Sequence, residues 1–239
     1  NLNQVEKFVL NEGENLKTFN FDQHLKCLSI FKVTFEILLN LSSNHIEELL
    51  LNSSNFVKDI NLKLLFPNIK HLQLDFSTFC DEFRMSSLEG NFKTLSLNYT
   101  RKAPEDYSNF KNLKSLQLCG NKFIKKIIGF KGKNLFLDRC FNLQNFNFNN
   151  LDSLYLQFNP YITGKDTELL KNIKTLDLSG TNIEYLSDKI NNLQIFIGQD
   201  CKYLQSFPYY KKIEILNLDN CINLKKINTL NINTLNVRG

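Results

Sequence analysis

The chain contains few residues of the types that carry out catalysis. It has three histidines, which are His24, His45 and His71. None of them belongs to the H-E-x-x-H pattern of a zinc protease, and no nucleophile turn or G-x-G-x-x-G accompanies them. The Gly164–Lys165 pair lacks the upstream glycine of a phosphate-binding loop. No pair of carboxylates has a spacing suited to general acid and base work. We therefore expect no enzymatic activity, no metal site and no cofactor.

The cysteines are the next residues with reactive side chains. There are six of them, with no C-x-x-C pair and no cluster at either end. Cys140, Cys201 and Cys221 recur at one position of a repeat described below, where a thiol is a small, weakly polar filler. We favour this structural role over redox or metal roles. A Cys201–Cys221 bond is compatible with neighbouring strands, but we expect free thiols, in a reducing environment or in a secreted protein that needs no disulfides.

Large aromatic side chains and one arginine are the strongest candidates for binding. They recur about one repeat apart through the middle of the chain, where other equivalent positions are mostly Thr, Ser, Asn, Gln and Asp. Aromatic residues and Arg are enriched where proteins bind each other. The candidate partner-binding residues, with one acid among them that supplies polar contacts, are Phe76, Tyr99, Phe136, Asp138, Arg139, Tyr155 and Phe158. The alternative for Phe76, Tyr99 and Phe158 is that they shield the core.

The charge distribution is uneven. Residues 1–60 carry five Lys and eight acids, a net charge of −3, whereas residues 61–133 carry thirteen basic residues and six acids, a net charge of +7. The densest basic stretch is KFIKKIIGFKGK (122–133), with Lys122, Lys125, Lys126, Lys131 and Lys133. Such a patch suits an acidic protein, an anionic lipid or a nucleic acid, but we favour a solvated lysine face. Nucleic-acid binding is not expected, because the stretch shows only part of the usual alternation of aromatic and basic residues.

Elements of one kind must position all these residues, because a short leucine pattern runs along the whole chain. Its form is L-x-x-L-x-L-x-x-N/C/T, as in NLKSLQLCGN (112–121) and NIKTLDLSGT (172–181). Each L-x-L core is typical of a short strand with alternate side chains inward. The fourth position recurs every 19 to 23 residues, at Phe8, Leu28, Leu49, Leu72, Leu95, Leu116, Leu135, Leu154, Leu176, Phe196, Leu216 and Leu235.

This pattern resembles the leucine-rich repeat family. The resemblance covers nearly the whole chain and implies one solenoid over residues 1–239, of about twelve repeats, without cysteine-rich caps. The implied fold is of the α/β type but mostly β: a horseshoe with a parallel sheet on its concave face and turns or short helices on its convex face. Brief helices are expected at residues 79–88 and 104–111. The ninth position, occupied by Asn121, Asn159, Thr181 and the three cysteines above, should bond to buried backbone groups.

The repeat alone leaves several functions open. Our leading hypothesis is a non-enzymatic module that binds a protein partner on its concave face. The abundance of Asn, Lys, Ile and Phe suggests an AT-rich genome, and this favours a secreted, host-interacting protein of an intracellular parasite over a cytoplasmic protein. The alternatives are an intracellular scaffold or ligase substrate adaptor, and an adhesin that binds glycans. No apolar stretch is long enough to span a bilayer. Because the sequence stops within a repeat, we also expect a homodimer through an uncapped end.

Overall fold

A computed structural model describes residues 5–12, 24–34, 42–56, 61–79, 91–101, 103–144, 148, 150–229 and 231–238. The chain divides into two compact units, unit 1 (Asn1–Leu118) and unit 2 (Cys119–Gly239). Each unit is a solenoid of parallel strands with very little helix. The mostly-β repeat architecture is therefore confirmed within each unit, while a single solenoid over residues 1–239 stays a prediction.

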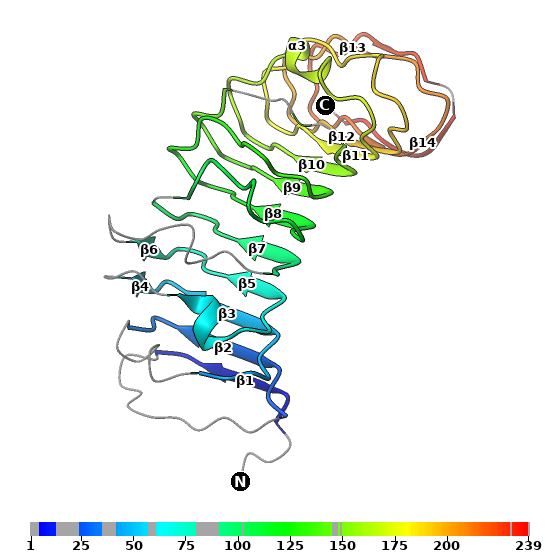
Figure 1. Cartoon of the computed structure of the whole chain (residues 1–239). Coiled ribbons are helices and arrows are strands. Elements are labelled where there is room, and N and C mark those ends of the chain that lie inside the picture. The colour runs from blue at the N-terminus through cyan, green and yellow to red at the C-terminus, as the bar shows by residue number, and fades with distance from the viewer. Residues whose placement is uncertain are drawn as a thin grey trace. The chain divides into compact units, whose positions relative to one another are not determined.

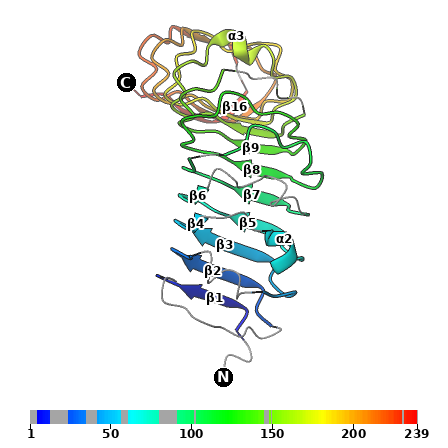
Figure 2. The same cartoon turned by 60° about the vertical axis from the view of Figure 1, so that its left-hand side comes forward.

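Unit 1 is built on one ladder of parallel strands. In order of pairing they are β1 (Lys7–Leu10), β2 (Cys27–Phe31), β3 (Glu48–Asn52), β5 (His71–Gln73), β7 (Thr94–Ser96) and β8 (Ser115–Gln117). Figure 1 shows these strands side by side, and Figure 2 shows the same strands in a view rotated by 60°. A second, two-stranded parallel sheet pairs β4 (Asn55–Phe56) with β6 (Thr78–Phe79).

Unit 2 repeats the same plan. Its ladder runs through β9 (Asn134–Phe136), β10 (Ser153–Tyr155), β11 (Thr175–Asp177), β12 (Ile195–Ile197), β14 (Ile213–Asn217) and β16 (Ile232–Asn236). The short strands β13 (Ser206–Phe207) and β15 (Lys226–Ile227) form a separate parallel pair. Each strand is thus bonded to strands about one repeat away in the sequence.

The pairing register follows the leucine pattern. Leu28 lies opposite Phe8 and Leu49, and Leu176 lies opposite Leu154 and Phe196. Between the first and last repeats, residues at the fourth and sixth positions point inward and are almost fully buried, as with Leu176 and Leu178, whereas Leu235 and Val237 of the last repeat are about half exposed. A slip of one residue would turn this apolar row to solvent, so the pattern itself fixes the register. The predicted register is confirmed in both units.

The inner row at the ninth position bonds to the backbone, as predicted. The Asn159 amide donates to the carbonyl oxygens of Leu137 and Leu156 at 2.9 and 2.8 Å. The Cys201 thiol donates to the Leu178 carbonyl oxygen at 3.1 Å. None of the described cysteines, Cys27, Cys119, Cys140, Cys201 and Cys221, forms a disulfide; Cys80 lies outside the described residues. Burial raises the pKa of Cys140 to about 12, which suits a filler rather than a nucleophile.

Of the two predicted helices, the one at 104–111 is wrong, and the one at 79–88 lies almost entirely outside the described residues. Residues 104–111 form turns. The Asp106 carboxylate accepts from the Ser108 amide and hydroxyl at 2.8 and 2.6 Å, and this local bonding competes with a helix. In the other range Phe79 belongs to β6, while residues 80–88 lie outside the described residues.

Within the described ranges, two short helices form where none was predicted. Helix α2 (Leu62–Leu65) begins after Asn61, whose side chain accepts from the Leu64 amide at 3.2 Å. Helix α3 (Gly164–Thr167) begins after Thr163, whose amide and hydroxyl both donate to the Asp166 carboxylate at 2.9 Å. The Gly164–Lys165 pair therefore starts a single helical turn. Side-chain capping of this kind explains both helices.

Candidate functional site

The backbone just after each strand is left-handed. At the eighth position of the repeat, φ lies between +54° and +73° for Glu12, Lys32, Ser53, Phe76, Tyr99, Gly120, Arg139, Phe158, Gly180, Asp200 and Asn220. Gly, Asn and Asp tolerate this conformation, whereas a bulky side chain there costs roughly 1–2 kcal/mol. Four of the predicted binding residues, Phe76, Tyr99, Arg139 and Phe158, occupy this row. Glycine stands at two equivalent positions, so the fold itself does not require the large side chains.

In unit 1 the two aromatic residues of this row form a stacked pair. The Phe76 and Tyr99 ring centroids lie 4.8 Å apart, with an interplanar angle of 2°. Even so, 58% of Phe76 and 44% of Tyr99 remain exposed. Each ring covers one face of the other and leaves its second face open to solvent. The core-shielding alternative therefore accounts for only part of their surface.

A buried carboxylate lies at the base of this pair. Asp75 is 8% exposed and accepts from the Ser96 hydroxyl at 2.6 Å and the Asn98 amide nitrogen at 2.9 Å. The side chains of Gln73 and Asn98 donate to its second oxygen at 3.1 and 3.2 Å. Because these donors compensate the charge, Asp75 can lie next to the core. Its hydrogen bonds to Ser96 and Asn98 hold together the two backbone segments from which Phe76 and Tyr99 project.

Of the histidines, only His71 lies on the strand face near these residues. It belongs to β5, is half-buried, and its Nδ1 lies 2.9 Å from the Thr94 hydroxyl. His45 is exposed on a turn outside the sheet. In the part of the chain that the structure describes, no three His, Cys, Asp or Glu residues are grouped closely enough to hold a metal ion.

In unit 2 the predicted pair Phe136 and Tyr155 also stacks. The two residues are register partners at the ends of β9 and β10, and their ring centroids lie 4.5 Å apart with an interplanar angle of 5°. Both are half-exposed. They project from the outer face of the sheet because the residues on either side of each ring, such as Leu135 and Leu137, point into the core.

Arginine and phenylalanine extend this pair beyond the strand ends. The Arg139 guanidinium carbon lies 5.2 Å from the centroid of the Phe158 ring, within range of a cation–π contact. Phe158 is 40% exposed. A Cβ added to Gly180 would lie 2.4 Å from the Phe158 ring, so glycine in the next repeat makes room for this ring.

Asp138 and Asp177 lie among the unit 2 rings, and the pKa values of Asp138 and Tyr155 are raised there. Burial, together with the nearby charge of Asp177, raises the pKa of Asp138 above its ordinary value. The Gln157 amide nitrogen, which donates to Asp138 at 2.8 Å, acts in the opposite direction. Burial and the charges of both aspartates also raise the pKa of Tyr155. The Tyr155 hydroxyl thus stays protonated at neutral pH and can donate a hydrogen bond.

Sequence reasoning missed an apolar extension of this face. Ile195 and Ile197 on β12 and Ile215 on β14 project on the same side as Tyr155, and Ile215 is 38% exposed. In the register, Asp177 lies between Tyr155 and Ile197. The signal was present in the alternation of I-F-I (195–197), but isoleucine in a leucine repeat is easily assigned to the core.

The predicted basic patch divides into two parts. Lys122, Lys125, Lys126 and Lys131 are exposed in the segment before β9. Lys133 instead donates to the Asn150 carbonyl oxygen at 3.0 Å and lies 3.9 Å from Asp152. Lys133 is exposed like the other four lysines, and these contacts join its repeat to the next one.

Comparison with known proteins gives no family for this chain, because no family model matches it and no curated protein matches it. In the ranges that the structure describes, no helix is long and apolar enough to cross a membrane.

Proposed function

We propose that this chain is a leucine-rich repeat protein, folded as a horseshoe, that binds a protein partner through its concave strand face without catalysing a reaction. The observation that carries the proposal is the placement of Phe76, Tyr99, Arg139 and Phe158. These bulky side chains occupy left-handed backbone and remain exposed. Strain without compensating burial indicates a role outside folding.

The unit 2 face offers the best anchor. Phe136 and Tyr155 present a stacked, half-buried aromatic pair beside the exposed Ile215. A rigid aromatic pair loses little conformational entropy on binding and gains a large contact area. Arg139 and Asp138 lie at its edge, where charged groups supply orientation and specificity.

A photo-crosslinking amino acid at position 155 tests this function. We expect it to capture one protein partner that the same probe at the exposed Tyr209 does not capture. Phe136→Ala and Tyr155→Ala together should then weaken binding of the purified partner by about 100-fold or more, since anchor residues each contribute about 2 kcal/mol. An unchanged affinity in a folded double variant would rule out this face.

A glycan-binding adhesin is the second candidate, because aromatic rings also stack on sugars. Phe76 and Tyr99 cover each other's inner faces, which leaves one open face on each ring and favours a protein partner. A glycan array separates the two candidates: specific binding that Phe76→Asn and Tyr99→Asn abolish would support the adhesin. The roles of a secreted host-interacting protein and of an intracellular scaffold or ligase adaptor concern the identity of the partner, which the crosslinking would reveal.

A further inference from the structure

A row of exposed apolar side chains lies on the outer turns of unit 2, away from the strand face. After the ninth position the chain makes a four-residue turn, closed for example by the Leu143 amide bonding to the Cys140 carbonyl oxygen and by the Leu204 amide bonding to that of Cys201. The two central residues of such a turn point to solvent. We name the exposed apolar residues at these central positions the turn ridge: Phe123, Phe141, Tyr161, Tyr203 and Ile222.

The exposure of the ridge is large. The exposed fractions are 71% for Phe123, 63% for Tyr161, 56% for Tyr203 and 68% for Ile222. The core does not require these rings, because exposed asparagines also occupy these turn positions: Asn142 follows Phe141, Asn223 follows Ile222, and Asn182 takes the first position after Thr181. One exposed ring on a turn is ordinary, but a row of them on successive turns indicates a surface that binds another one.

Asparagines hold the turns of the ridge together. The side-chain amide of Asn182 donates to the Pro160 carbonyl oxygen at 2.8 Å, and that of Asn223 donates to the Lys202 carbonyl oxygen at 2.7 Å. Each bond ties one turn to the turn before it. Since neighbouring strands lie about 4.8 Å apart, the apolar tips form a fixed row rather than independent loops.

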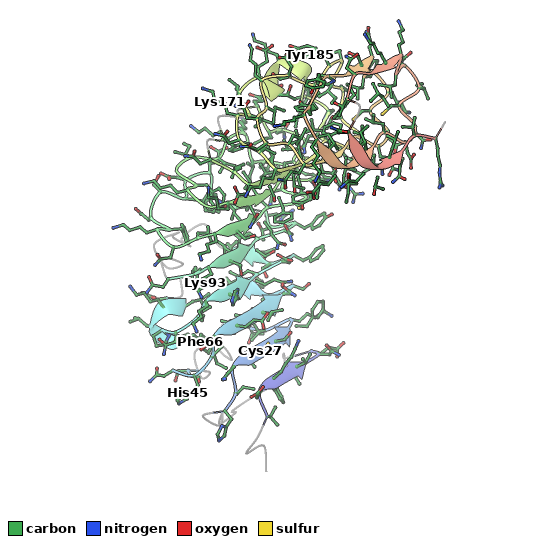
Figure 3. All side chains as sticks on the ribbon, turned by 90° about the vertical axis from the view of Figure 1, so that its right-hand side faces the viewer. Cys27, His45, Phe66, Lys93, Lys171 and Tyr185 are labelled. Carbon is green, nitrogen blue, oxygen red and sulfur yellow. The ribbon has the colours of Figure 1, made fainter. Side chains whose placement is uncertain are left out.

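The charge around the ridge is positive. The turns and the residues just after them (122–126, 141–144, 160–164, 182–185, 202–206 and 222–226) contain one acid, Glu184. Their lysines, all exposed, are Lys122, Lys125, Lys126, Lys202, Lys225 and Lys226. Three of these belong to the predicted basic patch, which thus lies beside Phe123. Figure 3 shows Tyr185, the last residue of the fourth stretch, beside α3.

We propose that the turn ridge binds the surface of an anionic phospholipid bilayer, a function separate from the partner binding on the strand face. Phe and Tyr enter the interface between headgroups and acyl chains, while lysines reach the anionic headgroups. Single apolar tips at the ends of turns suit a soft surface into which each can insert. Ile222 offers no face on which a base can stack, so the ridge fits a membrane better than a nucleic acid.

The absence of tryptophan from this sequence makes a direct test possible. Tyr161→Trp puts the only tryptophan of the chain on the ridge, and Tyr209→Trp puts a matched one on a residue that is 64% exposed but outside it. With vesicles of phosphatidylcholine and phosphatidylserine, we expect the emission of the Tyr161→Trp variant to shift to shorter wavelength and to be quenched by brominated lipid. The Tyr209→Trp emission should not change.

Cosedimentation with the same vesicles measures the contribution of each group. The combined variant Phe123→Ser, Tyr161→Ser and Tyr203→Ser should bind at least about tenfold more weakly, as should Lys122→Gln, Lys125→Gln and Lys126→Gln together. Phe136→Ala with Tyr155→Ala should bind vesicles like the natural chain, which separates this proposal from the partner site. The absence of vesicle binding, or binding without a Tyr161→Trp shift, would overturn it. So would a shift that appears with single-stranded RNA and not with vesicles.

Discussion

At the scale of single residues, the strand face depends on buried carboxylates whose donors come from their own and from neighbouring repeats. Asp75 and Asp177 each accept several hydrogen bonds within the sheet layer. Such groups hold the backbone in place only while their donors remain paired. Substitution of these aspartates should therefore displace the exposed rings by shifting the backbone that carries them. Neither aspartate has to contact a ligand for this effect.

Asp75→Ala should destabilise unit 1 by about 1–3 kcal/mol, because the Ser96 hydroxyl and the Asn98 amide would lose their acceptor in a buried site. Hydrogen exchange of the Asn98 amide is the direct measurement, and we expect it to become faster. Asp152→Ala is the control: Asp152 lies on the surface, 3.9 and 3.8 Å from Lys133 and Lys174, and its loss should change stability by less than about 1 kcal/mol. Equal effects of the two substitutions would contradict this account of Asp75.

Asp138 should make unit 2 less stable at neutral pH than in mild acid. Its pKa is raised in the folded chain, chiefly by burial, so the native state binds a proton more tightly than the unfolded state. The contribution of Asp138 to stability therefore improves as the pH falls through the raised pKa, and stops changing below the ordinary value of 3.8.

Asp138→Asn tests this dependence, because its amide oxygen can still accept from Gln157. The variant should gain stability relative to the natural chain at pH 7, and the gain should shrink as the pH approaches 4. Urea unfolding at several pH values would measure it. A difference that stayed constant with pH would show that Asp138 has no unusual titration.

Most residues of the candidate site could be named from the sequence, but their backbone conformation could not. Phe136 and Tyr155 were identifiable because strand alternation fixes which side chains face outward. The left-handed conformation of Phe76, Tyr99, Arg139 and Phe158 was not foreseeable from residue type, since large residues avoid it. The ridge was missed for a related reason: Phe123 and Tyr203 look like core residues until the turn that exposes them is known.

At the scale of elements, the repeat positions were predictable and the connections were not. The marker residues lie opposite one another in both ladders because an apolar row cannot shift without exposure to water. By contrast, the turn at 104–111 and helices α2 and α3 depend on single polar side chains such as Asp106, Asn61 and Asp166. One local hydrogen bond decides between such conformations, and a hydrophobic period carries no information about it.

The turn after β11 offers a test of how tightly one repeat fits the next. Gly180→Ala should destabilise unit 2 by roughly 1–2 kcal/mol through its left-handed backbone, and by more because the new Cβ meets the Phe158 ring. The Phe158→Ala background is the control. There the same substitution should cost only the backbone strain, and a double-mutant cycle by urea unfolding would give the difference. Equal costs in the two backgrounds would mean that the ring moves aside freely.

At the scale of the whole molecule, stability is a sum over neighbouring repeats. The strands of each ladder bond only to adjacent strands, and cysteine and asparagine side chains of the inner row reach one repeat back. In such a solenoid, a destabilising substitution first loosens its own repeat and the adjacent ones. The two units should therefore show separate responses to a substitution in one of them.

Leu216→Ala puts this to the test. Leu216 is fully buried on β14 between Phe196 and Leu235, so its truncation should cost about 2–5 kcal/mol. Hydrogen exchange followed by mass spectrometry should show faster exchange in β12 and β14, while β2 and β3 in unit 1 keep their natural rates. Uniformly faster exchange along the chain would instead show that the two units unfold as one.

The shared register of the fourth-position residues also bears on how the gene that encodes this chain can change in length. A deletion that runs from one marker to just before the next, for example residues 154–175, would bring Leu176 into the place of Leu154 beside Leu135. The shortened chain should still fold, with Tyr155 and Phe158 lost and the other surfaces kept. Unequal recombination between repeats would thus generate viable alleles of different length, each with a new combination of binding residues.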